Sequence, residues 1–439
     1  MAIHLCKMVC LPILFFLLFC SGILPALADD ERVKKEADSL QKEWEFEVEG
    51  QVRLRGDFAW NQDFTDFTFT PGRREGQFLE RSRVQVSLES KTLNLEAVAQ
   101  GQWYGRWGGR DERSDFDLYQ GYVAWEKALG LPISLKAGRQ ELSYGSAFFL
   151  GQNDSYNGLS WDGLKVSVDP AEQFDIDILG AKMAKLNNED PGIYLAGVYA
   201  TYQIDKERSV EGYLFYNKGG FPLFHREFEF VDSGQRWFTL GARIAGKIKG
   251  FDYELEPQFQ WGRVREVAGD GKDRVRAYGG HIELGYSFKF PWETRVFGAY
   301  ARGSGDNKPF DGTYTEFHGT VFTDTYLTGD MNVIADLSGL TVNNIRASGI
   351  RVAVGGITVN PLTDLSLTLR GHRFHATRGP SGFSRDLGTE LDLVLSYNLM
   401  KGISFLAGLD RFLTGRFFEQ TSKSKKNIDY LYLQAQVEF

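Results

Sequence analysis

The feature that most constrains the fold is a run in which apolar and polar residues alternate one by one. In the last ten residues, 430–439, Leu, Ala, Val and Phe occupy one set of alternate positions, and Tyr, Gln and Glu occupy the other. Successive side chains of a β-strand point to opposite faces, so this run is expected to form a strand with one apolar and one polar face. We expect it to close a barrel against the first strand, because a barrel leaves no exposed edge.

The same alternation recurs along the chain in eighteen segments, the first at 45–57 and the last at 428–439. The connections between them alternate in length, and the long ones are 58–78, 105–116, 142–160, 218–236, 264–274, 303–345 and 414–427. Barrels of the outer membrane have short periplasmic turns and long extracellular loops. The pattern therefore predicts an all-β fold, a transmembrane antiparallel barrel of about 18 strands.

The first residues have the order of a secretory signal peptide. The basic residue Lys7 precedes an apolar run at 8–19, and an Ala-x-Ala site ends at Ala28. We expect cleavage after Ala28, a short periplasmic segment at 29–44 and the barrel at 45–439. No later run has 18 uninterrupted apolar residues, which excludes a helical span, so insertion into the outer membrane requires a closed barrel.

Several classes of function are disfavoured by composition and motifs. All three cysteines lie in the expected signal peptide, which removes disulfides and thiolate metal sites, and the net charge of −8 argues against nucleic acid. The phosphate-loop-like run 241–247 lacks the final Ser or Thr and lies inside an expected strand, while His372 and His375 face opposite sides. The acidic segments 270–273 and 306–311 lack the EF-hand spacing. We therefore predict no catalytic, metal or cofactor site.

The polar faces of the expected strands carry many charges, which suits a water-filled lumen. Arg53, Arg55, Arg81 and Arg83 lie on neighbouring strands and could form a basic strip, because guanidinium binds carboxylates bidentately. The alternative is that these arginines pair with glutamates of the same strands and neutralise a packed wall; the candidates are Glu47, Glu49 and Glu89. Alternation places five further basic residues in the lumen: Lys136, Lys165, Arg243, Arg351 and Arg370.

Three segments resemble the alginate-export family of outer-membrane channels. They are LKAGRQELSYG at 135–145 followed by WDGLKV at 161–166, ARGSGD at 301–306 followed by FDG at 310–312, and LGTELDLVLSY at 387–397. The resemblance implies an eighteen-stranded barrel with a narrow passage for an anionic polysaccharide. Carried over by position, the residues lining that passage are Arg53 or Arg55, Arg81, Arg83, Arg139 and Arg370. Strict alternation turns Arg139 outward, and only a bulge or the strand end would bring it inside.

The leading hypothesis is a non-enzymatic outer-membrane channel that passes an anionic, alginate-like saccharide or polysaccharide, in the direction of export. Its partners would be that polymer or small anions, the lipid bilayer and export proteins on the periplasmic side. A general or anion-selective porin for small-solute uptake and an outer-membrane enzyme on a barrel scaffold stay open as alternatives. The solute, its direction and the position of segment 303–345 are not determined by the sequence.

Overall fold

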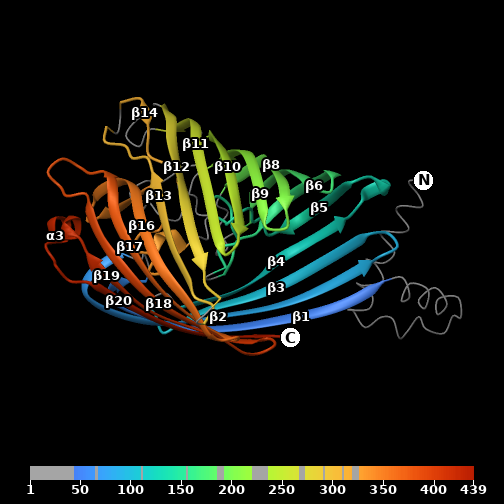
Figure 1. The fold of residues 1–439 in the computed structure, drawn as a ribbon, viewed down its shortest axis with the longest axis horizontal. Helices are drawn as coiled ribbons and strands as arrows, with labels where there is room; N and C mark the ends of the chain where they lie inside the picture. The colour runs from blue at the N-terminus through green and yellow to red at the C-terminus, as the bar shows by residue number, and fades with distance from the viewer. Residues whose placement is uncertain are drawn as a thin grey trace, which may run out of the picture.

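The chain is described by a computed structural model at residues 44–64, 68–109, 112–154, 157–184, 192–219, 236–265, 272–289, 292–308, 311–318 and 326–439. The expected signal peptide and almost all of the segment 29–44 lie outside these residues. The described residues form one sheet of twenty strands, eighteen of which close into an antiparallel barrel (Figure 1). The first strand, β1 (Glu45–Asp63), pairs antiparallel with the last, β20 (Ile428–Glu438), which confirms the predicted closure.

Each predicted strand has a counterpart in the barrel. The remaining barrel strands are β2 (Thr68–Ser90), β3 (Leu95–Trp107), β4 (Arg113–Trp125), β5 (Ile133–Gln140), β6 (Trp161–Ala171), β7 (Phe174–Met183), β8 (Tyr194–Asp205), β9 (Arg208–Lys218), β10 (Arg236–Ile248), β11 (Phe251–Arg265), β12 (Lys272–Ser287), β13 (Arg295–Gly303), β16 (Ile345–Leu362), β17 (Leu365–Arg378), β18 (Asp386–Met400) and β19 (Ile403–Thr414). Each pairs with its neighbours in sequence, except that β13 pairs with β16.

The connection between β13 and β16 contains two short strands of its own. In it, β14 (Thr313–Tyr314) pairs in parallel with β12, and β15 (Gly339–Val342) forms a hairpin with β16. In the residues that the structure describes, the short helical elements are η2 (Ala128–Gly130), η3 (Tyr326–Thr328) and α3 (Arg416–Ser422). Among the described residues, no helix has the length and the hydropathy to cross a membrane.

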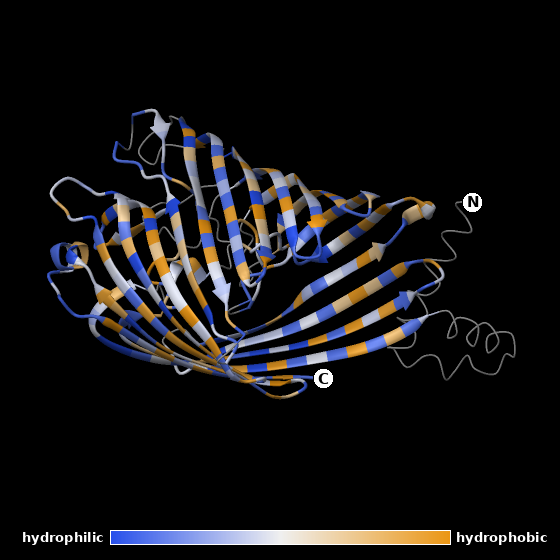
Figure 2. Ribbon diagram, viewed as in Figure 1, coloured by the Kyte–Doolittle hydropathy of each residue, from blue (hydrophilic) through white to orange (hydrophobic). Residues whose placement is uncertain are grey.

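The outer surface of the barrel is the apolar face of the alternating strands. Leu54, Leu240, Leu369 and Leu433 are each about half exposed, although each belongs to a strand with paired neighbours. Hydrophobic and hydrophilic residues follow one another along these strands (Figure 2). An exposed apolar band of this extent faces lipid in a membrane barrel, whereas it would be unfavourable in water.

One predicted connection differs from the structure. The expected loop 58–78 is mostly strand, because the β1–β2 ladder continues to the pair Asp63–Thr68. Pro257 lies inside β11. Beside it the β10–β11 pairing is interrupted, as expected where proline supplies no N–H group.

Two connections fold into the barrel rather than away from it. Segment 141–160, between β5 and β6, buries Phe148 and Phe149. The centre of the Phe148 ring lies 4.4 Å from the centre of the His281 ring on β12. The described part of segment 304–344 buries Met331 and Ile334 in the same apolar cluster. The backbone of Met331 accepts a bond from Gln62 on β1 and donates one to Glu390 on β18. Segment 141–160 thus contacts β12, and segment 304–344 contacts β1 and β18.

Candidate lumen site

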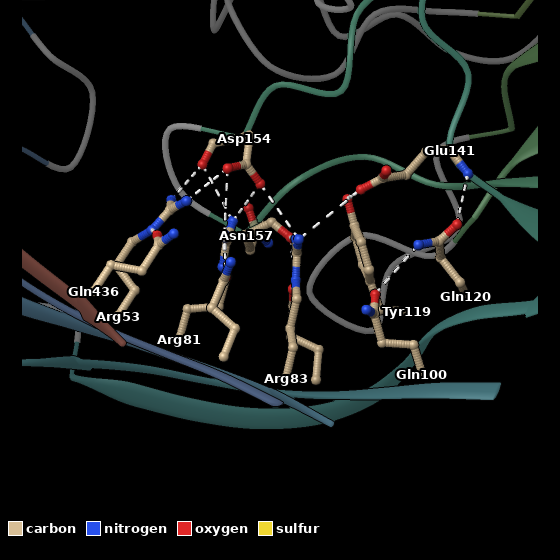
Figure 3. A network of polar contacts seen from close by, with 12 residues as sticks. Arg53, Arg81, Arg83, Gln100, Tyr119, Gln120, Glu141, Asp154, Asn157 and Gln436 are labelled. Carbon is tan, nitrogen blue, oxygen red and sulfur yellow. Dashed lines mark hydrogen bonds and ion pairs between the residues drawn. The ribbon is translucent and has the colours of Figure 1, made fainter. Parts of the chain in front are cut away.

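Three arginines of neighbouring strands point into the barrel side by side (Figure 3). Arg53 on β1 is directly opposite Arg81 on β2, and Arg83 follows two positions later on the same face. Their exposed fractions are 8%, 2% and 8%. Like charges directly opposite each other destabilise a strand pair, so this arrangement requires a counter-charge.

That counter-charge is Asp154, which segment 141–160 brings to the arginines. Its carboxylate lies 2.6 Å from Nη2 of Arg53, 2.6 Å from Nη1 of Arg81 and 3.4 Å from Nη1 of Arg83. Its backbone carbonyl also accepts bonds from Arg53 and Arg81, at 2.5 and 3.2 Å. Burial raises the pKa of Asp154, but the hydrogen bonds and charges of Arg81 and Arg53 outweigh it and hold the pKa below its usual range.

Wall residues orient the three guanidinium groups. Arg53 donates to Gln436 at 2.8 Å, Arg81 to Gln51 at 2.6 Å and Arg83 to Gln102 at 2.6 Å. Arg83 also lies 3.8 Å from the centre of the Tyr119 ring. The alternative in which these arginines neutralise glutamates of their own strands does not match the contacts, since Glu47, Glu49 and Glu89 are exposed.

Two further predicted arginines, Arg55 and Arg370, lie near segment 304–344, which also folds into the barrel. Arg55 lies 2.7 Å from Asp57 and 4.1 Å from the centre of the Tyr432 ring. Arg370 lies 2.6 Å from Asp330, a residue of segment 304–344, and the Tyr432 hydroxyl donates to the same carboxylate at 3.3 Å. Arg55 and Arg370 therefore share one polar region of the lumen.

Arg243 also points inward, between two acidic wall residues. It lies 2.6 Å from Glu211 and 3.0 Å from Glu254, and Glu254 contacts His281 at 2.9 Å. Among the described residues, Glu254, Glu256 and His281 form a group that could hold a metal ion by proximity. Because Arg243 already supplies the positive charge beside Glu254, we assign no metal to this group.

The two predicted lysines have local partners on the wall. Lys165 lies 3.2 Å from Asp177, which also accepts a bond from Tyr144 of the inward segment at 2.7 Å. Lys136 lies 3.6 Å from the centre of the Tyr122 ring. Both lysines therefore have wall partners other than Asp154.

The expectation that Arg351 lines the lumen is wrong. Arg351 is exposed on β16, while the neighbours Val352 and Val354 are buried on the inward face. The alternation is intact, but its apolar side faces inward here because segment 304–344 packs against it with residues such as Ile334. The rule that apolar side chains face lipid fails where a loop covers the wall.

Arg139 also lies outside the lumen, contrary to its position in the family resemblance. Its guanidinium forms a two-pronged ion pair with Asp162, at 2.7 and 2.9 Å. Asp162 is exposed, on the same side of β6 as Leu164. The pairing of β5 with β4 and β6 continues without a bulge at Arg139, so strict alternation holds and turns it outward.

Three residues of the cluster, Gln102, Tyr119 and Asp154, were not predicted from the sequence. Gln102 alternates with outward residues of β3, so the strand pattern could have identified it. Tyr119 lies where the register of the β3–β4 pairing shifts, so strict alternation along β4 does not place it. Asp154 lies in a connection without periodicity, and no pattern in the sequence connects it to Arg53, 101 residues earlier, or to Arg81, 73 residues earlier.

The comparisons agree with this architecture. The family model described as alginate export matches residues 45–429. No curated protein matches the chain. Solved structures with a similar fold include OccK9 (OpdG) from Pseudomonas aeruginosa, with a TM-score of 0.61 at 12% identity, covering 90% of this chain and 98% of that one. OpdL from the same organism has a TM-score of 0.60 at 10% identity, with coverages of 90% and 99%.

OccK11 (OpdR) from Pseudomonas aeruginosa is also similar, with a TM-score of 0.57 at 15% identity, covering 89% of this chain and 96% of that one. At these identities the three structures establish the fold, an eighteen-stranded outer-membrane barrel. The family model covers most of the chain, from the first residue of β1 into β20. The chain therefore belongs to the alginate export family of outer-membrane barrel channels.

Proposed function

We propose that this channel exports an anionic polysaccharide of the alginate type, and that Arg53, Arg81 and Arg83 contact the carboxylates of the polymer. The observation that carries the proposal is the convergence of three guanidinium groups on the single carboxylate of Asp154. Each uronate unit of such a polymer carries the same group. The planar fork of arginine binds that group bidentately and stays charged at any physiological pH.

In this proposal Asp154 occupies the place of a polymer carboxylate while the channel is at rest. The cavity beside the cluster, lined by Gln102, Tyr119 and Asn157 among others, is about 50 Å³. Such a cavity holds one or two water molecules but no sugar ring. Segment 141–160 therefore moves when the polymer passes, and the polymer replaces the contacts that Asp154 gives up.

Block of ionic current tests the proposal. The purified barrel is inserted into planar bilayers, and the current is recorded with uronate oligomers or with neutral oligosaccharides of equal length on the periplasmic side. We expect concentration-dependent block by the uronates only. The variant with Arg53, Arg81 and Arg83 replaced by Gln should weaken the block at least tenfold, since each lost charge-assisted contact costs about 1.5 kcal/mol or more.

The matched control is Arg411→Gln, which removes an arginine that pairs with Asp429 on the outer face and should leave the block unchanged. A porin for small anions would give an anion-selective current that uronate and neutral oligomers affect equally. An enzyme on a barrel scaffold would shorten the oligomers, which mass spectrometry of the bath solution would detect. Either outcome would overturn the export proposal.

A further inference from the structure

Four basic residues form a continuous row on the outer surface of the barrel. Lys218 on β9 is directly opposite Arg236 on β10, Arg236 is opposite Arg263 on β11, and Arg263 is opposite Arg274 on β12. All four are exposed, at positions that alternate with buried residues such as Trp237. We call these four residues the outer basic row.

The row lies at the extracellular boundary of the apolar band. One step nearer the membrane centre, the outward residues of β9, β10 and β11 are Tyr216, Phe238 and Trp261, whose rings follow one another at 5.0 and 5.4 Å. On β12 the residue at this level is the exposed Arg276, which is opposite Trp261. Next in that direction come Leu240 and Phe259, which are about half exposed. Aromatic girdles mark the interface between acyl chains and headgroups, so the outer basic row lies at the level of the headgroups.

Within the described part of the chain, no acidic side chain forms an ion pair with any residue of this row. Other outward arginines at this end do have one: Arg373 lies 2.9 Å from Asp386, and Arg411 lies 3.1 Å from Asp429. Cations placed directly opposite one another repel and weaken a strand pair. Four such positions in succession are therefore consistent with an external anion.

We propose that the outer basic row binds the phosphate groups of a phosphorylated glycolipid of the outer leaflet, of the lipid A class. Strands about 4.8 Å apart place the four charges within about 14 Å, so one headgroup with two phosphates can contact several of them. Arginine is well matched to phosphate, and the acyl chains of such a lipid would cover the aromatic and aliphatic residues below.

A second outward pair extends the same surface. Arg302 on β13 is directly opposite Arg351 on β16, both are exposed, and Arg302 lies 5.8 Å from the centre of the Tyr278 ring on β12. The outward orientation of Arg351 thus fits a lipid contact, whereas it contributes nothing to the lumen.

Lipid binding to the full-length barrel in detergent tests the proposal. Native mass spectrometry measures the affinity for bisphosphorylated lipid A, for phosphatidylglycerol and for phosphatidylcholine. The test variant replaces Lys218, Arg236, Arg263 and Arg274 by Gln. Basic residues near a lipid surface each strengthen anionic lipid binding about fivefold, so lipid A affinity should fall at least a hundredfold.

The matched control removes the same number of charges from the periplasmic turns: Lys206, Lys249, Lys289 and Lys401, each replaced by Gln. It should bind lipid A like the unchanged protein. If the four-residue variant does not assemble, the variant Arg236→Gln with Arg263→Gln removes the central pair and should still lose at least tenfold.

Three results would overturn the proposal. The first is equal lipid A affinity of the row variant and the control. The second is phosphatidylglycerol binding as tight as lipid A binding, which would indicate general attraction to anions. The third is a row variant that retains lipid A but no longer binds uronate oligomers at its surface, which would make the row a docking surface for polysaccharide.

Discussion

The replacement Asp154→Asn should make the channel more selective for anions by an amount that depends on salt. Asn keeps the shape of the side chain but removes one negative charge from the arginine cluster. At about 7 Å in water, a unit charge changes the energy of a monovalent ion by about 0.6 kcal/mol. The change is favourable for anions and unfavourable for cations, so it counts twice in the permeability ratio.

Salt reduces the effect in a predictable way. In 0.1 M salt the Debye length is about 10 Å, which leaves about half of the interaction, and the ratio of anion to cation permeability should rise about threefold. In 1 M salt the Debye length is about 3 Å, and the ratio should change by less than about 1.3-fold. Reversal potentials measured across KCl gradients centred on these two concentrations give both values.

The same replacement should also loosen segment 141–160. Asp154 accepts two short charge-assisted bonds, from Arg53 and Arg81, and its side chain is 37% exposed. After allowance for solvent screening, their loss costs about 2 kcal/mol, so the mean conductance should rise. The control Asp162→Asn removes the same charge from the outer face and should change neither quantity. An unchanged reversal potential in 0.1 M salt, or an equal shift in 1 M salt, would refute the placement of Asp154 on the ion path.

Three further predictions follow from particular contacts. Replacement of Arg81 and Arg83 by Glu should shift the selectivity of the channel towards cations, which the reversal potential measures. The folded band should persist in unheated SDS gels. An unchanged reversal potential would exclude both arginines from the ion path. Replacement of Gly50 by Val and deletion of Phe439 should each slow barrel assembly, because a Cβ at Gly50 would lie 2.3 Å from the Phe439 ring that packs there. Normal assembly of either variant in pulse-chase gels would contradict this. Burial raises the pKa of Asp336 to about 6. The folded state therefore binds this proton more tightly than the unfolded chain, and the free energy of unfolding falls as the pH rises from about 4 to 6. After correction for the intrinsic pH dependence of exchange, the amides around Asp336 should be more protected at pH 5 than at pH 7. The variant Asp336→Asn should remove this difference.

The strands could be predicted because one physical rule applies along the whole wall. A strand that separates lipid from a polar interior must alternate, and β20 and β1 do so in register, from Gln51–Glu438 to Trp60–Asp429. The rule gave the wrong face where its assumption failed, as at Val352 and Val354 of β16. There the interior is a folded segment rather than water, so both faces of the strand are apolar in places.

The partners of the lumen arginines could not be predicted in the same way. Alternation places Arg53 and Arg81 on one face, and strand order makes them neighbours. Which carboxylate meets them depends on the path of segment 141–160, and a connection without periodicity gives no information about its path. Asp154 is therefore a property of the tertiary structure rather than of any local pattern.

The lumen contains two kinds of ion pair with different consequences for a solute. Arg55 pairs with Asp57 two residues away on the same strand, and Arg243 pairs with Glu211 on the adjacent strand. These pairs are held by the ladder, and separating one would leave a partly buried charge without its partner. A passing anion cannot replace such a carboxylate without disrupting the wall.

The pairs made by Asp154 and Asp330 are different, because both carboxylates belong to connections rather than to barrel strands. If such a connection moves away, its carboxylate returns to water while Arg53, Arg81 and Arg370 keep their wall contacts and become free for another anion. Exchange of one carboxylate for another leaves the number of charge-assisted bonds nearly constant, so the energy along the path varies little. A polymer with a carboxylate on every unit can advance through sites of this kind, whereas the fixed pairs only shape the wall between them.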